Sequence, residues 1–320
     1  MKLRYRGGTP EAEITQLFSP AMEKLFLSDD KVVYLDADLM GSLKTQELWE
    51  KYPSRVFNCG IQEANMVGVA AGLYLAGYKP YIHSFAPFIT RRVFDQVFLS
   101  VGYGHKRVHL IGSDAGIMAT DNGGTHMCFE DIAMMRTIPN ACIVDVTDGT
   151  MLTNMLETTK DWDGVTYFRT ARRNVPDVYE RDTHFSIGKG FVLTEGDDVT
   201  VIASGVMVAT ALDAAQQLAE QGIHVRVVDP VTVKPLDEEL VIQCAQETGA
   251  IVTAENHSIH GGLGGAVAEL LAERHPVPVL RIGVRDQFGQ VGPEAFLREQ
   301  YHLRAEDIVE QVHAALKIKQ

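Results

Sequence analysis

Cysteine is scarce in this chain, and its four cysteines show no CxxC spacing: Cys59, Cys128, Cys142 and Cys244. That distribution fits neither a disulfide framework nor a zinc site, so we expect reduced, buried thiols. The chain also lacks the run of roughly 20 apolar residues that a membrane span needs, and its first residues do not resemble a signal peptide. We therefore expect a cytoplasmic protein that does not bind membranes.

Positive charge is also limited. Lysine and arginine number 29 against 42 aspartates and glutamates, which gives a net charge of −13 at pH 7. Such a chain repels nucleic acid unless a local basic patch reverses the field. The nearest basic group, Arg172 with Arg173, is short. Nucleic acid is therefore not an expected partner.

Several common catalytic motifs are missing. The sequence contains no Walker motif, no HExxH and no GxSxG. The segment GGLGGAVAEL at 261–270 is similar to a glycine-rich nucleotide loop, but it lacks the register after a strand and the acidic partner of a dinucleotide site. There is also no GDG followed some 25 to 30 residues later by asparagine, the pattern that holds magnesium and a diphosphate. We expect no metal ligands in this chain.

The residues that are present predict an α/β protein of two domains. With 320 residues, 46% of them hydrophobic, the chain can supply two cores. Short Val/Ile-rich runs alternate with amphipathic stretches of helical length, which is typical of a parallel sheet. In the first half these runs are VVYLDADL, RVFNCG, KPYIHSFA, RVHLIGSD, ACIVDVTD and VTYFRT, and in the second half VTVIAS, HVRVVD, AIVTAE and PVLRIG.

A polar stretch without helical periodicity, 174–190, separates the two halves and reads as a linker. We place the boundary near residue 186, with a first domain at 1–185 and a second at 186–320. In the second domain, the helix expected at 207–222 has Ser204 as a possible N-terminal cap and Gly222 as its end.

The segment RVFNCGIQEAN at 55–65 is the most informative, because a short apolar strand runs through Gly60 into a helix that begins near Glu63. The helix that follows is almost free of polar groups. A carboxylate beside such a helix is either paired or used chemically. The alternative is an ordinary glutamate at a helix start, facing the positive end of the helix dipole.

Other polar and aromatic residues follow the predicted strands, where ligands bind in sheets of this kind. His126, in the loop with Asp121 and Asn122, is a candidate acid, base or hydroxyl-binding group, or else a histidine that caps a helix. Asp121 and Asn122 could be simple turn formers, and the two glycines beside them let the backbone approach a ligand. The wider set is Asp36, Asp38, Ser42, Ser84, Ser113, Asp114 and Arg169.

Phe85 and Phe88 are three residues apart, so a helical turn would place both rings on one side, where they could stack on a flat heterocycle or belong to the core. Arg91, Arg92 and Arg172 are candidates for binding a substrate phosphate, since a guanidinium suits that geometry. The alternative for these arginines is ordinary solvation of a helix.

Taken together, IQEANMVGVAAGLYLAGYKPYIHSFAPF, the GGTH loop, FEDIAMMRTIPN and ENHSIHGGLGG resemble the C-terminal half of a transketolase, from about residue 10 to 315. The resemblance implies a pyrimidine-binding domain of a thiamine diphosphate enzyme followed by a transketolase C-terminal domain. Since the diphosphate motif is missing, it implies one subunit of a split enzyme. A partner subunit would carry that motif and hold Mg²⁺ or Ca²⁺, within a heterotetramer that acts on sugar phosphates.

The resemblance also implies roles for individual residues. Glu63 matches the glutamate that hydrogen-bonds a ring nitrogen of the cofactor's aminopyrimidine and favours its imino tautomer, and Phe85 and Phe88 match the aromatic wall against that ring. Asp38 and Ser42 resemble the segment that approaches cofactor and substrate. His126 matches a histidine that contacts the donor sugar.

The expected phosphate-binding arginine is Arg172, and Arg91 stands where many transketolases have a tyrosine. The extra residue in ATDNGGTH leaves open whether Asp121 or Asn122 reads the donor's stereochemistry. Three alternatives also stay open: a 1-deoxyxylulose-5-phosphate synthase-like activity, a 2-oxo acid dehydrogenase beta subunit, and a non-catalytic assembly subunit.

Overall fold

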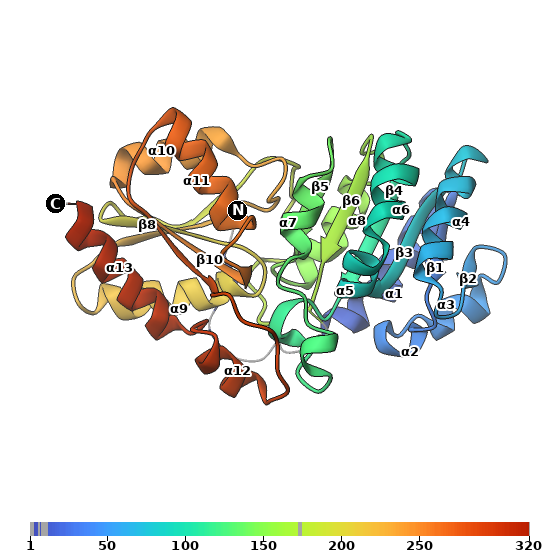
Figure 1. The fold of residues 1–320 in the computed structure, drawn as a ribbon, viewed down its shortest axis with the longest axis horizontal. Coiled ribbons are helices and arrows are strands. Elements are labelled where there is room, and N and C mark those ends of the chain that lie inside the picture. The colour runs from blue at the N-terminus through green and yellow to red at the C-terminus, as the bar shows by residue number, and fades with distance from the viewer. Residues whose placement is uncertain (1–2, 6, 8–11, 172–174, 320) are drawn as a thin grey trace.

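The computed structural model describes residues 3–5, 7, 12–171 and 175–319. Two sheets, each covered by helices, follow one another along the chain and lie side by side (Figure 1). The first sheet has six strands and the second has five. Within the described residues, no helix is long and apolar enough to cross a membrane.

All six strands of the first sheet are parallel, as the alternating sequence pattern predicts. Their order across the sheet is β2-β1-β3-β4-β6-β5. The strands are β1 (Val32–Asp36), β2 (Val56–Asn58), β3 (Lys79–Phe85), β4 (Val108–Ser113), β5 (Cys142–Asp145) and β6 (Val165–Arg169). The helical segments are α1 (Ile14–Ser28), α2 (Met40–Leu43), α3 (Gln46–Lys51), α4 (Glu63–Leu75), α5 (Ala86–Ile89), η1 (Arg91–Val93), α6 (Phe94–Gln96), η2 (Val97–Tyr103), η3 (Gly116–Met118), η4 (Gly123–Thr125), α7 (Asp131–Arg136) and α8 (Gly149–Thr158).

Helices cover both faces of this sheet, because alternate strand residues point to opposite sides. Tyr34 of β1 belongs to the same buried cluster as Phe18 of α1. Its neighbour Leu35 belongs instead to the cluster that contains Met66 of α4. In the sheet, β1 lies between β2 and β3, so the chain continues from β1 to β2 on one side and places β3 on the other side. Loops that diverge in this way leave room for a ligand at the carboxyl ends of the strands.

The second sheet has the order β11-β10-β8-β9-β7, in which only β7 is antiparallel to its neighbour. The four predicted strands are confirmed, but β7 was missed because it is a four-residue edge strand without a helix after it. The elements are β7 (Phe191–Thr194), β8 (Val199–Ala203), α9 (Met207–Ala219), β9 (Val225–Asp229), α10 (Glu238–Thr248), β10 (Ile251–Ser258), α11 (Leu263–Arg274), β11 (Val279–Val284), α12 (Glu294–Gln300) and α13 (Ala305–Lys319).

The prediction that Ser204 caps α9 is wrong. Val206 occupies the N-cap position and makes no side-chain cap bond. The Ser204 hydroxyl instead donates to Asp145 Oδ2 of the first domain at 2.7 Å. The helix ends earlier than predicted, at Ala219 with Glu220 as its C-cap, and Gly222 lies in the turn that follows, with a φ of 77° that a residue with a side chain rarely adopts. A serine just before a helix is typical of an N-cap, and the local sequence does not show that this serine bonds to the other domain.

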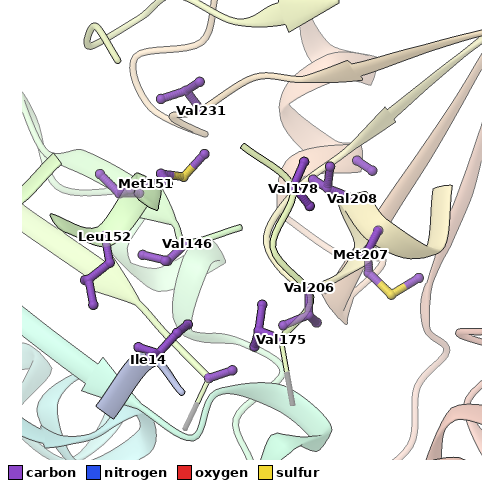
Figure 2. Close-up of a cluster of buried hydrophobic side chains, with 14 of the residues drawn as sticks. Ile14, Val146, Met151, Leu152, Val175, Val178, Val206, Met207, Val208 and Val231 are labelled. Carbon is purple, nitrogen blue, oxygen red and sulfur yellow. The ribbon is translucent and has the colours of Figure 1, made fainter. Parts of the chain in front are cut away.

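The two domains share an apolar junction. Val146 and Met151 of the first domain lie across from Val206 and Val208 of the second, with the segment that carries Val178 between them (Figure 2). The segment 175–190, which connects the two sheets, contains no helix or strand other than a bridge from Leu3 to Tyr179. The predicted boundary near residue 186 falls within it and stays a prediction.

A buried arginine, held by carboxylates of its own domain, links the two domains through a hydrogen bond. Arg169, at the end of β6, donates from Nε to Asp131 Oδ2 at 2.8 Å and from Nη2 to the carbonyl of Asn256 at 2.6 Å. Its Nη1 lies 3.3 Å from Asp145 Oδ1. Burial works against a charge on Asp131, but Arg169, His257 and Tyr167 together outweigh burial and lower the pKa of that carboxyl. Arg169 is therefore a structural residue at the junction.

The glycine-rich segment 261–270 has an anion of its own. The backbone N–H groups of Leu263 and Gly264, at the start of α11, donate to the Glu255 carboxylate at 2.7 and 2.9 Å. A Cβ at Gly262 would lie 2.0 Å from Glu255 Oε2. The carboxylate thus fills the place that a phosphate takes in a nucleotide loop.

Glu255 should make the stability of the chain pH-dependent. Burial raises its pKa from 4.5 to about 7, so the folded chain binds an extra proton between these values. The contribution of this proton to the free energy of unfolding is complete below pH 4.5 and is lost as the pH rises through 7. The free energy of unfolding falls by on the order of 1–3 kcal/mol over this range. Asp229, with a pKa raised by burial to about 6, acts in the same direction.

We expect Glu255→Gln to flatten this fall in the free energy of unfolding, measured by urea denaturation of the isolated chain between pH 5 and 8. The control is Glu273→Gln, which changes an exposed glutamate of α11, the helix whose first N–H groups bind the Glu255 carboxylate. If Glu255→Gln had the same pH profile as wild type, Glu255 would not be the group that makes the stability pH-dependent.

Candidate functional site

Glu63 stands where the sequence predicts it. Strand β2 ends at Asn58, Gly60 turns the chain with a φ of 70°, and Glu63 is the first residue of α4. Its side chain is 3% exposed. The hydroxyl of Ser84, near the end of β3, donates to Glu63 Oε1 at 2.9 Å. The sheet therefore delivers a buried carboxylate to its carboxyl edge.

The other partner of Glu63 is Arg92, in the turn η1. Arg92 Nη1 donates to both carboxylate oxygens of Glu63, at 3.0 and 2.9 Å. The Arg92 side chain is 45% exposed. Its guanidinium carbon lies 3.7 Å from the centroid of the Phe88 ring. Arg92 thus covers the carboxylate from the solvent side while it stacks on an aromatic ring.

Three rings form a wall beside this pair. The centroids of Phe85 and Phe88 are 6.1 Å apart, so both lie on one side, as predicted. The ring of His126 lies 5.7 Å from Phe85 and 5.0 Å from Phe88. His126 Nδ1 is 2.9 Å from the hydroxyl of Thr125. Sequence segments 40 residues apart therefore meet at one aromatic surface beside Glu63.

The surroundings of His126 favour its neutral form. Burial, followed by the positive charge of Arg92, lowers its pKa, and the Asp114 carboxylate only partly opposes this. A neutral imidazole can donate one hydrogen bond and accept another. This suits contact with hydroxyl groups of a ligand.

The remaining predicted residues lie around this centre. Asp121 and Asn122 are exposed in the turn before η4. Arg91 donates to Glu130 Oε1 at 2.6 Å, and both of these side chains are exposed. Ser42 lies in the short helix α2. Arg172 lies outside the described residues.

Asp38 follows β1 at the same edge of the sheet as Glu63. It adopts a φ of 65°, and its Oδ1 accepts a hydrogen bond from Asn58 Nδ2 at 2.9 Å. Since Asn58 ends β2 and its Oδ1 accepts from the N–H of Gly60, this contact links the end of β1 to the turn that leads to Glu63.

The glycines beside His126 serve packing within the chain, which differs from the expectation that they make room for a ligand. A Cβ at Gly123 would lie 2.5 Å from Val291 Cγ2, and one at Gly124 would lie 2.3 Å from the carbonyl oxygen of Gly289. The second domain therefore presses on the loop that carries His126. Sequence alone could not reveal this contact, because the two segments are more than 160 residues apart.

A buried network that the sequence did not predict runs behind the site. His83 Nδ1 lies 2.8 Å from Asp36 Oδ2, and His83 Nε2 lies 3.0 Å from Ser113 Oγ. The Tyr34 hydroxyl donates to Asp36 Oδ2 at 2.7 Å. These contacts have the pattern of a hydrolase triad, but Asp36, His83 and Ser113 are almost fully enclosed. A substrate cannot reach the serine, so the network joins β1, β3 and β4 structurally.

We expect Ser113→Ala to lower the free energy of unfolding by about 1–2 kcal/mol, because it removes the partner of a buried His83 nitrogen. Urea denaturation of the isolated chain measures this. Ser19→Ala, which removes an exposed hydroxyl that donates to a backbone carbonyl, is the control and should have a smaller effect. Equal effects of the two changes would argue against a structural role for the network.

The arrangement suits a flat, nitrogen-containing ring. Phe85 and Phe88 offer aromatic faces, and the Glu63 carboxylate beside them can accept hydrogen bonds from ring or amino N–H groups. The guanidinium of Arg92, itself planar and rich in N–H donors, already makes both contacts. Within the described residues, no group of three or more His, Cys, Asp and Glu side chains could hold a metal ion.

Comparison with protein families gives two matches along the chain. Residues 11–178 match the model of the transketolase pyrimidine-binding domain. Residues 188–308 match the model of the transketolase C-terminal domain. The first match contains Glu63, the aromatic wall and His126.

Two curated relatives have different lengths. The 6-deoxy-6-sulfo-D-fructose transketolase subunit SqwH of Clostridium sp. (strain MSTE9) is 47% identical over 91% of this chain and 90% of the relative. The 1-deoxy-D-xylulose-5-phosphate synthase of Heliobacterium modesticaldum is 37% identical over 92% of this chain, which spans 46% of that protein.

Among solved structures, one described as "Split gene transketolase, inactive beta4 tetramer" superposes with a TM-score of 0.90 at 41% identity. The match covers 96% of this chain and 99% of the other. The similarity thus extends over both domains.

Proposed function

Because this chain belongs to the transketolase family, we propose that it is the pyrimidine-binding, C-terminal subunit of a split transketolase. The enzyme would move a two-carbon ketol unit from a ketose phosphate to an aldose phosphate. The observation that carries the proposal is the buried Glu63 carboxylate beside the Phe85 and Phe88 rings. The enzyme is proposed to be cytoplasmic.

The proposed cofactor is thiamine diphosphate. When bound, it would supply a nucleophilic thiazolium carbon for reaction with the carbonyl of the donor. In this proposal Glu63 shares a proton with a ring nitrogen of the aminopyrimidine, while Phe85 and Phe88 pack against that ring. The low exposure of Glu63 supports this role, because exclusion of water strengthens a hydrogen bond to a carboxylate.

The proposal requires a partner subunit. This chain contains no GDG motif, so an N-terminal transketolase subunit would bind the diphosphate and Mg²⁺ or Ca²⁺, in a heterotetramer. Two comparisons support this division. The SqwH relative is named as a subunit and has a similar length. The structural relative is described as a split gene transketolase and as an inactive beta4 tetramer.

Donor recognition in this proposal centres on His126. A neutral imidazole against the aromatic wall can contact a sugar hydroxyl without repelling a cationic ring. Asp121 and Asn122 are exposed a few residues before it, and one of the two is proposed to read donor stereochemistry. Asp38 and Ser42 would approach cofactor and substrate from the end of β1. Arg91 and Arg172 remain the proposed phosphate-binding residues.

A 1-deoxyxylulose-5-phosphate synthase-like reaction is the second candidate. The specific observation in its favour is the 37% identity with the synthase of Heliobacterium modesticaldum. That protein is about twice the length of this chain, whereas the SqwH relative has a similar length. The higher identity with the SqwH relative, 47% against 37%, favours the split transketolase.

We expect Glu63→Gln to reduce kcat of the reconstituted enzyme by roughly 10²-fold or more, because the amide cannot exchange a proton at the cofactor ring. Steady-state assays with a ketose phosphate donor measure the loss, and native mass spectrometry checks assembly with the partner. Glu238→Gln is the matched control, since Glu238 is an exposed glutamate in the first turn of α10. Near wild-type turnover of Glu63→Gln would rule out the proposed mechanism.

The donor separates the two candidate reactions. We expect the complex to consume a ketose phosphate and to release the shortened aldose phosphate, without carbon dioxide. Pyruvate with an aldehyde acceptor, assayed by carbon dioxide release, should give at least roughly tenfold lower kcat/KM. A preference for pyruvate would favour the synthase-like alternative.

A further inference from the structure

The contact between Arg92 and Glu63 is asymmetric. Glu63 is almost completely enclosed, whereas nearly half of the Arg92 side chain is open to solvent. A buried carboxylate without a partner is unfavourable, so Glu63 needs a donor whenever no ligand is bound. Arg92 provides that donor from the solvent side. The Glu63 carboxylate is enclosed by the fold, whereas the Arg92 side chain borders the solvent.

The neighbouring arginine makes a different contact. Arg91 pairs with Glu130, and both side chains of that pair are exposed. Arg92 instead lies against the Phe88 ring, with its guanidinium carbon 3.7 Å from the ring centroid, and donates to both oxygens of Glu63. Two adjacent side chains of the same type therefore diverge, and only Arg92 enters the site.

A guanidinium and an aminopyrimidine resemble one another in shape and bonding. Both are flat, both can stack on an aromatic face, and both present N–H groups in their plane to a carboxylate. The proposed cofactor ring would need the Phe88 face and the Glu63 carboxylate at the same time. Arg92 makes both contacts in this structure, and two planar groups cannot occupy one ring face together.

We propose that Arg92 is a built-in stand-in for the aminopyrimidine, which pairs with Glu63 and covers Phe88 until thiamine diphosphate enters and displaces it toward solvent. This inference rests on the proposed function. It adds that the isolated subunit blocks its own pyrimidine site, and that cofactor binding competes with an internal contact. The cofactor then binds with an affinity reduced by the fraction of molecules in which Arg92 is closed.

The first test is the Kd of thiamine diphosphate for the complex reconstituted with its partner subunit, measured by isothermal titration calorimetry with Mg²⁺ present. Arg92→Ala should lower Kd by roughly five- to thirtyfold, since the competitor is removed. Arg92→Lys should fall between wild type and Arg92→Ala, because an ammonium pairs with Glu63 but is not planar.

Arg107→Ala is the matched control. Arg107 pairs with Asp161 near the start of β4, at the opposite edge of the sheet, and its loss changes the net charge equally. Its Kd should equal that of wild type. An equal gain in affinity in Arg92→Ala and Arg107→Ala would reduce the effect to general electrostatics and overturn the inference.

A double-mutant cycle tests whether Arg92 acts through Glu63. In a Glu63→Gln background the change Arg92→Ala should alter Kd by less than roughly twofold, because the neutral amide holds the guanidinium weakly. A full gain in affinity without the carboxylate would contradict competition at Glu63.

The isolated chain offers a readout that needs no cofactor. Burial is the largest cause that lowers the pKa of His126, and the positive charge of Arg92 is the next. The charge of Asp114 acts in the opposite direction. Titration of His126 by NMR should therefore show a higher pKa in Arg92→Ala than in wild type. An unchanged pKa would mean that Arg92 does not lie over the aromatic wall.

The outcomes separate the inference from the function on which it rests. If both wild type and Arg92→Ala bind thiamine diphosphate, but the variant binds with equal or weaker affinity, only the stand-in role fails. If neither complex takes up the cofactor, the proposed function fails and the inference falls with it.

Discussion

The enclosed charge of Glu63 is the constraint around which the first domain is organised. A carboxylate at 3% exposure is tolerated only where donors surround it. The Ser84 hydroxyl of β3 and the Arg92 guanidinium of η1 supply these donors from two separate segments. The winding of the chain in both directions from β1 is what brings β2 and β3, with their following residues, to one edge.

The second domain contributes to this site from a distance. Residues 289–291 pack against Gly123 and Gly124 and so help to position the loop that carries His126. Arg169 and the apolar cluster of Figure 2 join the two domains that make this contact. The transketolase C-terminal domain therefore supports the geometry of the site in addition to any role in assembly.

Much of the fold could be read from the sequence, because its signals are local. The apolar strand runs and the helices between them predicted all six strands of the first sheet and four of the five in the second. The strand β7 escaped because four residues at a sheet edge carry no periodic signal. Ser204 was assigned to a helix cap because its actual partner, Asp145, is distant in the chain.

The sequence by itself determined the α/β class, the position of Glu63 at a strand-to-helix turn and the pairing of the Phe85 and Phe88 rings, since each depends on neighbours within a few residues. Only the tertiary structure decided which partners those residues meet. Arg92 rather than Arg91 reaches Glu63, His83 joins Asp36 to Ser113, and Glu255 fills the glycine-rich turn. These contacts depend on side-chain direction and on the order of strands in the sheet, which no local pattern encodes.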